Sequence, residues 1–210
     1  MSKTVRGLQG LLLLFALGIC GAAQAFVVSI DPGPRAVYLR VGNGVFSGTN
    51  YNNGGTPGSG GPINLVSVSV PAAVLGNGTN LAMTTNATNG NSNYDGFAFC
   101  NVPAEIYVGG FYRRNGTGTA TLTATVPANL TTTAGDTIPF SQISWTSSGN
   151  NDTGAQPVPA GTFAGGSTQA LASFPVNTWR ESCHSFSYGN DAVVASGTYT
   201  GRVTYTLSAP

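Results

Sequence analysis

The chain has 210 residues, a formal net charge of +1 and only 7% charged residues, against about 25% in a typical soluble domain. Such weak and balanced charge argues against a nucleic-acid surface, which needs clustered Lys and Arg, and against electrostatic membrane binding. Apolar residues at 41% and aromatic residues at 10% argue against the highly charged disordered class. The polarity comes instead from Thr, Ser, Asn and Gly, a composition that suits extracellular β-sheet proteins.

Residues 1–25 have the three parts of a secretory signal peptide. Two basic residues precede the apolar run at 11–17, and a small-x-small cleavage site follows at 23–25. The apolar run is shorter than the roughly 20 residues that span a bilayer. We expect export to the periplasm, the cell surface or the medium, with a mature chain that begins at Phe26 and has no membrane span. Removing the two basic residues of the signal leaves six arginines against seven acids, a net charge of −1.

The three cysteines allow more than one interpretation. Cys20 could carry a lipid anchor, but Ile19 stands where such a signal needs a small residue. The mature chain keeps Cys100 and Cys183, which in an exported protein predict one disulfide, with two free thiols as the alternative. A bridge that closes so long a loop stabilises a protein by roughly 4–5 kcal/mol.

Apolar residues alternate with period two along the chain, and no segment has a long helical periodicity. The segments that predict strands are 37–41, 65–70, 106–110, 119–126, 138–145 and 198–207. Turn-rich stretches at 42–62, 76–96 and 149–166 predict exposed loops. We therefore expect an all-β fold, an antiparallel β-sandwich of immunoglobulin-like or pilin-like type, formed by residues 26–210 as one domain.

The residues give little support for catalysis or metal binding. His184 is the one histidine, and in a strand its side chain and that of Cys183 would point to opposite faces. That geometry argues against a Cys–His nucleophile, and one histidine with two cysteines does not make a zinc site. We expect no catalytic residue, no metal and no cofactor. A calcium site at 149–154 is a weaker alternative, because the run lacks dense acids.

The acidic residues and the sequons mostly mark turns. Asp31, Asp95, Asp136 and Asp152 stand in turn sequences, where Asp is favoured for backbone reasons. Two of the seven acids could still face each other across a cleft, which leaves a hydrolase as a third hypothesis. The Asn-x-Thr sequons at Asn77, Asn86, Asn115, Asn129 and Asn151 indicate exposed loops, and the run 113–116 predicts a solvated hairpin end.

Aromatic side chains offer a different chemistry, the stacking of sugar rings. The candidates are Trp145, Trp179, Tyr51, Tyr94 and Tyr112. We expect Trp145 to pack in the core. Trp179 is followed by two charged residues and is therefore the better candidate for an exposed ligand contact.

The stretch Ala195-Ser-Gly-Thr-Tyr-Thr-Gly-Arg-Val-Thr-Tyr-Thr-Leu207 places a glycine before an alternating strand close to the C-terminus. With the signal peptide and a single disulfide, it resembles bacterial pilin-like and spore-coat-U-like surface subunits. Ala209 and Pro210 stand where that family usually has a tyrosine next to the end. The resemblance implies a fimbrial type of structural or adhesive subunit, not an enzyme, in which a strand of one subunit completes the sheet of the next. Its partners would be copies of itself, related subunits or a periplasmic chaperone.

The same resemblance indicates which residues would assemble. Phe26, Val28 and Ile30 form a short apolar comb at the new N-terminus, and we expect them to add a strand to a neighbour. The other assembly candidates are Tyr199, Val203, Tyr205 and Leu207 of the last strand. A competing expectation is that the comb folds into its own sandwich. The second hypothesis for function is then a monomeric, carbohydrate-binding β-sandwich.

Overall fold

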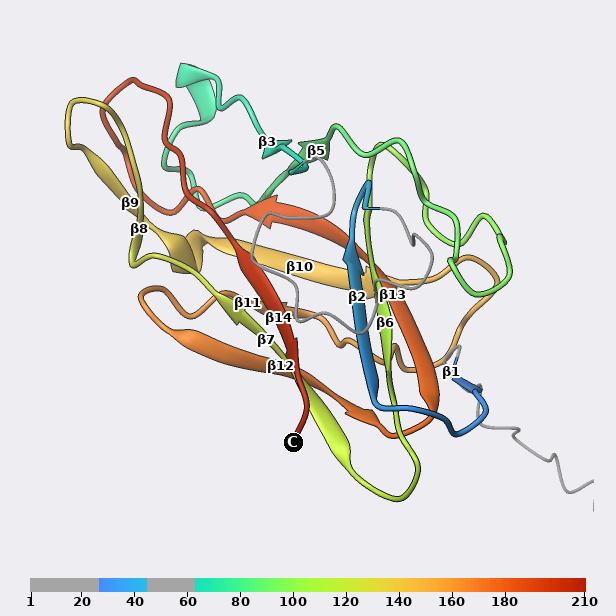
Figure 1. The fold of residues 1–210 in the computed structure, drawn as a ribbon. Helices are drawn as coiled ribbons and strands as arrows, with labels where there is room; N and C mark the ends of the chain where they lie inside the picture. The colour runs from blue at the N-terminus through green and yellow to red at the C-terminus, as the bar shows by residue number, and fades with distance from the viewer. Residues whose placement is uncertain (1–26, 45–62) are drawn as a thin grey trace, which may run out of the picture.

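The structure is a computed structural model that describes residues 27–44 and 63–210 (Figure 1). In these ranges antiparallel strands form two main sheets that pack against each other, which confirms the predicted all-β sandwich. The expected signal peptide, Cys20, Phe26 and Tyr51 lie outside the described residues. No helix in the described ranges is long and apolar enough to cross a membrane.

The larger sheet has seven strands and is organised around β13 (Thr178–Tyr188). The others are β11 (Gly161–Thr162), β10 (Ile143–Ser148), β6 (Ile106–Arg113), β2 (Ala36–Val41), β4 (Leu81–Ala82) and β1 (Val27–Ser29). The main path runs β11-β10-β13-β6-β2. β6 and β4 pair along one edge of β13, while β1 and β10 share the other edge.

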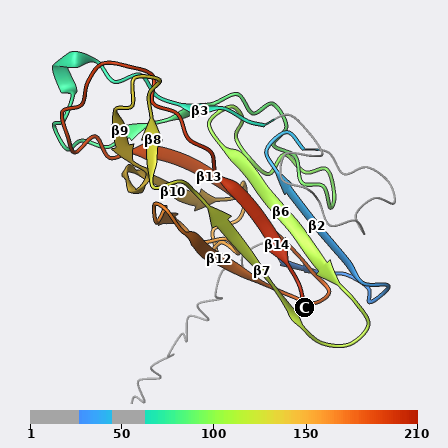
Figure 2. The ribbon, with the colours of Figure 1, turned by 60° about the vertical axis from the view of Figure 1, so that its left-hand side comes forward.

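The smaller sheet has three strands in the order β12-β7-β14 (Figure 2). They are β12 (Thr168–Pro175), β7 (Thr119–Thr125) and β14 (Thr204–Ser208). Two short pairs lie outside the main sheets: β3 (Val66–Ser67) with β5 (Thr84–Thr85), and β8 (Asn129–Thr131) with β9 (Thr137–Pro139). Two 3-10 turns occupy Ala72–Val74 and Phe140–Gln142.

The main core lies between the two sheets and follows the predicted alternation. β7 buries its alanines and Leu122 toward the large sheet, while its threonines face outward. The large sheet contributes Val108, Tyr112 and Phe186 to the same core. Trp145 is also buried there, as expected. Period-two alternation predicts a strand with one buried face and one solvent-exposed face.

Two predicted strands are interrupted in the structure. The segment 198–207 does not form one strand: β14 begins only at Thr204, while Thr200 bridges to Thr131. Between them the chain passes tightly over the core, since a Cβ on Gly201 would lie 2.7 Å from atoms of Leu130 and Phe140. The segment 138–145 is divided by the 3-10 turn at 140–142 into β9 and β10.

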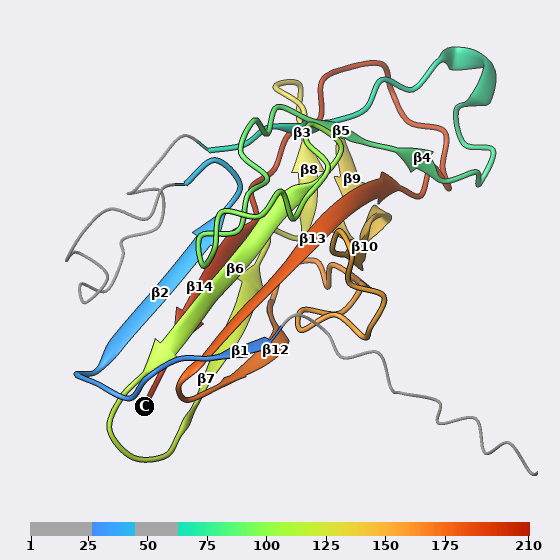
Figure 3. The same ribbon diagram turned by 90° about the vertical axis from the view of Figure 1, so that its right-hand side faces the viewer.

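The outer face of the large sheet is covered in part by the chain between residues 86 and 105, which Figure 3 shows against the ends of β2 and β6 and which a disulfide connects to β13. The predicted disulfide is present: Cys100 of this segment is bonded to Cys183 of β13, with 5.4 Å between their Cα atoms. This cover creates a second, smaller buried region on the side of the sheet away from the main core.

Candidate functional site

Two edge strands, β2 of the large sheet and β14 of the small one, contact each other along one side of the sandwich. Within the described ranges β2 pairs only with β6, and β14 only with β7, so each has an unpaired backbone edge. We call this side the β2–β14 seam. Its half-buried apolar side chains, which pack against the main core, are Val37, Leu39, Val41, Val203, Tyr205 and Leu207. An unpaired edge above apolar side chains can accept a further strand.

Tyr205 places an unsatisfied polar group in the seam. Its ring is half-buried, but its hydroxyl is closed off from solvent and has no hydrogen-bond partner in the described structure. Burial raises the pKa of Tyr205, so the phenol stays protonated and remains a donor. A buried donor without an acceptor costs about 1–3 kcal/mol.

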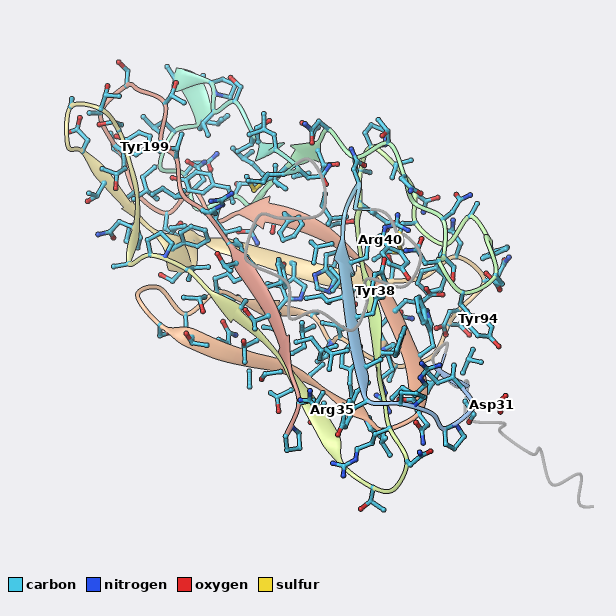
Figure 4. The ribbon with its side chains drawn as sticks, viewed as in Figure 1. Asp31, Arg35, Tyr38, Arg40, Tyr94 and Tyr199 are labelled. Atoms are coloured by element: carbon cyan, nitrogen blue, oxygen red, sulfur yellow. A yellow bond between two sulfur atoms is a disulfide. The ribbon has the colours of Figure 1, made fainter. Side chains whose placement is uncertain are left out.

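The assembly candidates of the last strand are therefore not one set. Val203, Tyr205 and Leu207 share the inward side of the seam, as predicted. Tyr199 does not belong with them: it lies before the break at Gly201, and its hydroxyl donates to the carbonyl of Ala195 at 2.8 Å. Figure 4 shows Tyr199 far from Arg35, at the other end of the molecule.

Arg35 holds the end of the chain beside the seam. Its guanidinium donates to the backbone carbonyls of Ala209 at 3.0 Å and Pro210 at 3.3 Å. It precedes β2 directly, so it connects the start of one seam strand with the end of the other. These contacts join residues that are separated by 174 and 175 positions in the sequence, so neither segment alone could predict them.

The described part of the N-terminal comb lies against its own chain in the structure. β1 pairs antiparallel with β13, and Val27, Val28 and Ser29 lie opposite Arg180, Trp179 and Thr178. The amide of Ile30 adds one hydrogen bond, to the carbonyl of Asn177 at 2.9 Å. Val28 and Ile30 pack on the small outer core. This is the competing outcome that the sequence left open.

Trp179 is buried, and the prediction of an exposed ligand contact is wrong. Only 4% of its surface is accessible, and its ring packs against Tyr38, Tyr94 and Phe111. Arg180 and Glu181, the two charged residues that suggested exposure, do not bring Trp179 to the surface. Arg180 lies on the opposite face of β13, and Glu181 is itself fully buried. The exposed member of this cluster is Tyr94, at 48%.

The buried carboxyl of Glu181 lies next to this cluster and was not predicted from the sequence. One oxygen of Glu181, Oε2, accepts from the indole of Trp179 at 2.8 Å and from the hydroxyl of Tyr107. The second oxygen has no hydrogen-bond partner among the described residues, although the Ser92 hydroxyl is near enough to lower the pKa of Glu181. Burial outweighs these contacts and raises that pKa. Burial, and then the charge of Glu181, also raise the pKa of Tyr107.

Arg40 of β2 lies above Tyr107 and holds the covering segment in place. Its guanidinium is 4.2 Å from the centre of the Tyr107 ring, a cation–π contact. It donates to the carbonyls of Gly42, Asn89 and Asn91 at 2.7–2.9 Å, and to the side chain of Asn93. Figure 4 shows Arg40 and Tyr38 side by side on β2, facing the segment that carries Tyr94. The available signal was that Tyr38 and Arg40 alternate with the apolar residues of this strand.

The donor atoms of Cys100, Cys183 and Glu105 lie within 4.8 Å of one another, which resembles a metal site. Both sulfurs are consumed by the disulfide. The Glu105 carboxylate accepts from the Asn101 amide at 2.6 Å and from the Ser148 hydroxyl at 2.7 Å. These residues therefore serve as structural supports of the covering segment, since a disulfide leaves no thiolate to bind a metal.

His184 is fully buried on the inner side of β13, stacked on Trp145 and beside Phe186. Cys183 points to the outer side, as the sequence predicted. Neither ring nitrogen of His184 has a hydrogen bond of good geometry to any side chain or backbone group in the described ranges. Burial lowers the pKa of His184 to about 4, so the imidazole is neutral at pH 7.

Two of the predicted turn aspartates have that role in the structure. Oδ1 of Asp95 accepts from the amide of Phe97, and Oδ1 of Asp152 accepts from that of Gly154, both at 2.9 Å. These bonds, two residues ahead, are Asx turns. The two buried carboxyls are Glu105, at the end of the covering segment, and Glu181 of β13.

Comparisons of the chain with protein-family models, with curated proteins and with solved structures found no match in any of the three.

Proposed function

We propose that this protein is a secreted structural or adhesive surface subunit, without enzymatic activity, that assembles by strand addition at the β2–β14 seam. The observation that carries the proposal is the unpaired edge of β14 over half-buried apolar side chains, next to the buried Tyr205 hydroxyl that has no acceptor. The signal-like residues 1–25 and the pilin-like C-terminal stretch support the same function.

An added strand would meet both needs of the seam. Its backbone would pair with the free edge of β14, and its apolar side chains would cover Val203 and Leu207. One of its carbonyls would accept from Tyr205, which removes the cost of an unpaired buried donor. A mature net charge of −1 gives little repulsion between copies.

The proposed donor is the N-terminal comb of a second copy. In its own sheet β1 is held by three residue pairs and one further backbone hydrogen bond, and Val27 is 40% exposed. A segment held so lightly can exchange, because local opening free energies are lowest at chain termini. A related subunit or a periplasmic chaperone could fill the same seam before assembly.

A disulfide lock tests the donor without removing it. Ser29 and Thr178 are register partners of β1 and β13, and antiparallel partners lie at the Cα separation that a disulfide needs. In mature protein carrying both Ser29→Cys and Thr178→Cys, oxidation should fix β1 in its own sheet. We expect monomers by light scattering when it is oxidised, and oligomers or fibres by electron microscopy when the new bridge alone is reduced.

The native bridge is a built-in control, because Cys183 is fully buried and Cys100 is 5% exposed, so mild reductant should reach the engineered bridge first. Equal assembly of the locked and unlocked forms would show that the comb is not the donor. A mature protein that stays strictly monomeric at high concentration in both forms would remove the assembly proposal altogether.

The exposed ring of Tyr94 supports a second candidate, a monomeric carbohydrate-binding domain. Tyr94 rests on buried Trp179 at 6.0 Å between ring centres, and half-buried Tyr38 continues the cluster. Retention in gels that contain soluble polysaccharides would test it. Tyr94→Ala should abolish retention, whereas Phe97→Ala, at a similarly exposed ring on the same loop, should not. If both variants kept the retention of the wild type, this candidate function would be contradicted.

A further inference from the structure

The sequence contains five Asn-Gly pairs, and their asparagines are Asn43, Asn53, Asn77, Asn89 and Asn115. In such a pair the backbone nitrogen of the glycine can attack the side-chain amide of the asparagine, because glycine has no side chain to hinder the approach. All except the pair at Asn53 lie in described residues, so the structure shows how freely four of them can react.

Asn115 and Gly116 form the exposed tip of the loop that connects β6 of the large sheet to β7 of the small sheet, so the predicted hairpin end is instead a connection between the two sheets. No hydrogen bond holds the Asn115 amide or the Gly116 nitrogen within the described structure. Gly116 has a φ of +100°, and nothing lies within 4 Å of the position that a Cβ would take. The tip is therefore open around both reacting groups, and its conformation favours glycine.

Two of the other pairs are held by hydrogen bonds. Oδ1 of Asn43 accepts from the amides of Thr88 and Asn89, at 2.8 and 3.2 Å. Oδ1 of Asn77 accepts from the Thr79 amide at 2.9 Å and from the buried side chain of Asn190 at 3.0 Å. The nitrogen that would attack Asn77 is itself a donor, to the Asn190 carbonyl at 3.0 Å.

The pair at Asn89 is restrained by burial. Its Oδ1 accepts from the Asn91 amide at 3.2 Å, and its carbonyl accepts from Arg40 at 2.7 Å. Gly90 is buried so closely that a Cβ there would lie 2.3 Å from the carbonyl oxygen of Cys100. The rearrangement that brings the nitrogen onto the side-chain carbon needs space that this turn does not have.

We propose that Asn115 is a site of spontaneous self-modification in the folded protein, converting to aspartate and isoaspartate while the pairs at Asn43, Asn77 and Asn89 persist. The Gly116 nitrogen bonds to Cγ of Asn115, the C–N bond of the amide breaks, and ammonia leaves with the proton that the nitrogen loses. The resulting succinimide is opened by water at either carbonyl. No oxidant, reductant or enzyme is needed.

The product places a carboxylate next to Arg114, whose guanidinium donates to the carbonyl of residue 115 at 3.2 Å and to the Tyr112 hydroxyl at 3.3 Å. The mature net charge changes from −1 to −2. Isoaspartate also lengthens the backbone, but the tip lies outside the paired residues of β6 and β7. The sandwich should therefore tolerate the change.

The experiment ages the mature, oxidised protein in a mildly alkaline buffer and follows each pair by chymotryptic peptide mapping and isoaspartyl methyltransferase labelling. The protected pairs must first break hydrogen bonds or open a buried turn. We expect Asn115 to convert about tenfold faster or more, the factor that one to two ordinary hydrogen bonds represent. Asn115→Gln should abolish the fast conversion and leave the fold unchanged, because this exposed side chain has no hydrogen-bond partner in the part of the chain that the structure describes.

The same chain, reduced and unfolded in urea, is the matched control. There the four pairs should convert at similar rates, which would show that the folded structure causes the selectivity. Conversion of Asn115 no faster than that of the other pairs in the folded protein would overturn the proposal. Equal selectivity in the unfolded chain would overturn it as well, because local sequence alone would then be the cause.

Discussion

At the scale of single residues, Arg40 is the side chain on which most of the outer face depends. Its guanidinium reaches three backbone carbonyls and one amide side chain, and it stacks on Tyr107. A planar fork with five donors can do this, whereas an ammonium group cannot. The arginine is 2% exposed, so any acceptor it released would have no water to replace it.

Replacing Arg40 by Lys should therefore lower the free energy of unfolding by about 3 kcal/mol, because several buried carbonyls lose a charged donor. Urea unfolding followed by tryptophan fluorescence measures this. Arg202→Lys is the matched control, since Arg202 is exposed and should change stability by less than about 0.5 kcal/mol. Equal stability of the two variants would show that the Arg40 contacts carry little free energy.

His184 should make the protein sensitive to acid. Its pKa is about 4 in the folded protein and about 6.5 in the unfolded chain, so between these values only the unfolded chain binds the proton. Stability is therefore lost as the pH falls from about 6.5 to about 4, by about 3 kcal/mol in total. The contribution of Glu181 has the opposite sign, because its raised pKa makes the folded state bind its proton first as the pH falls.

The difference between wild type and His184→Leu isolates the histidine from Glu181 and the other carboxyls. Urea unfolding at a series of pH values between 4 and 7.5 should show the wild type losing stability faster than the variant across this window. Parallel curves would mean that His184 finds a partner for its charge.

At the scale of elements, a strand can be predicted from sequence when only one of its faces is buried. β7 was found this way, and the alternation of 65–70 also corresponds to alternating burial. β2 and β6 are covered on both faces, yet they were found because apolar residues occupy alternate positions of their inner faces. β13, the longest strand, is also covered on both faces and was missed, because every second residue from 178 to 184 on its inner face is polar or charged. Burial on both faces removes the alternation and admits His184, Glu181 and Ser182 as interior residues.

The candidate site divides in the same way. The inward side of the last strand from Val203 to Leu207 could be predicted, because it depends on local pattern, and the two cysteines of the expected mature chain allowed only one pairing. The group of Arg40, Tyr107 and Glu181 could not, because its members come from three strands distant in sequence. The burial of Trp179 has the same origin, as its cover comes from the segment around Tyr94.

The orientation of β14 gives a test at this scale. Tyr205 faces the core, and Thr206 is exposed on the other face. Tyr205→Asp should abolish soluble expression, because an unpaired charge would enter the apolar seam. Thr206→Asp should cost about 1 kcal/mol or less, the range of strand propensities. Similar yields of the two variants would show that the register of β14 is wrong.

A milder change separates folding from assembly. Tyr205→Phe removes only the unpaired hydroxyl, so the monomer should be as stable as wild type or more stable, by up to about 1–3 kcal/mol. The proposed acceptor interaction is lost at the same time, so assembly should weaken. Loss of monomer stability instead would mean that the hydroxyl already has a partner.

At the scale of the whole molecule, the large sheet is apolar on both sides, so both of its faces must be covered. Its outer face carries Tyr107, Phe111 and Trp179, which a single small sheet on the opposite side leaves uncovered. The segment 86–105 covers part of that face, and β1 contributes Val28. The segment has little regular structure of its own, so its position depends on the Cys100–Cys183 bridge and on Arg40.

The disulfide and Arg40 both hold the segment 86–105, so their contributions to the free energy of unfolding should not be additive. Replacing Cys100 and Cys183 together by Ala opens a loop with a sequence separation of 83 and should cost about 4 kcal/mol. While Arg40 remains, it still holds the carbonyls of Asn89 and Asn91, so the cover stays closed. With Arg40→Lys added, both ties are lost and the outer core is exposed, so the combined loss should exceed the sum of the separate losses by about 1 kcal/mol or more. Hydrogen exchange at 89–93 should rise sharply only in this combination.

The same cysteine variant combined with Arg202→Lys is the control, and its stability losses should be additive within about 0.5 kcal/mol. Additive losses in both combinations would mean that the bridge and Arg40 stabilise the fold independently.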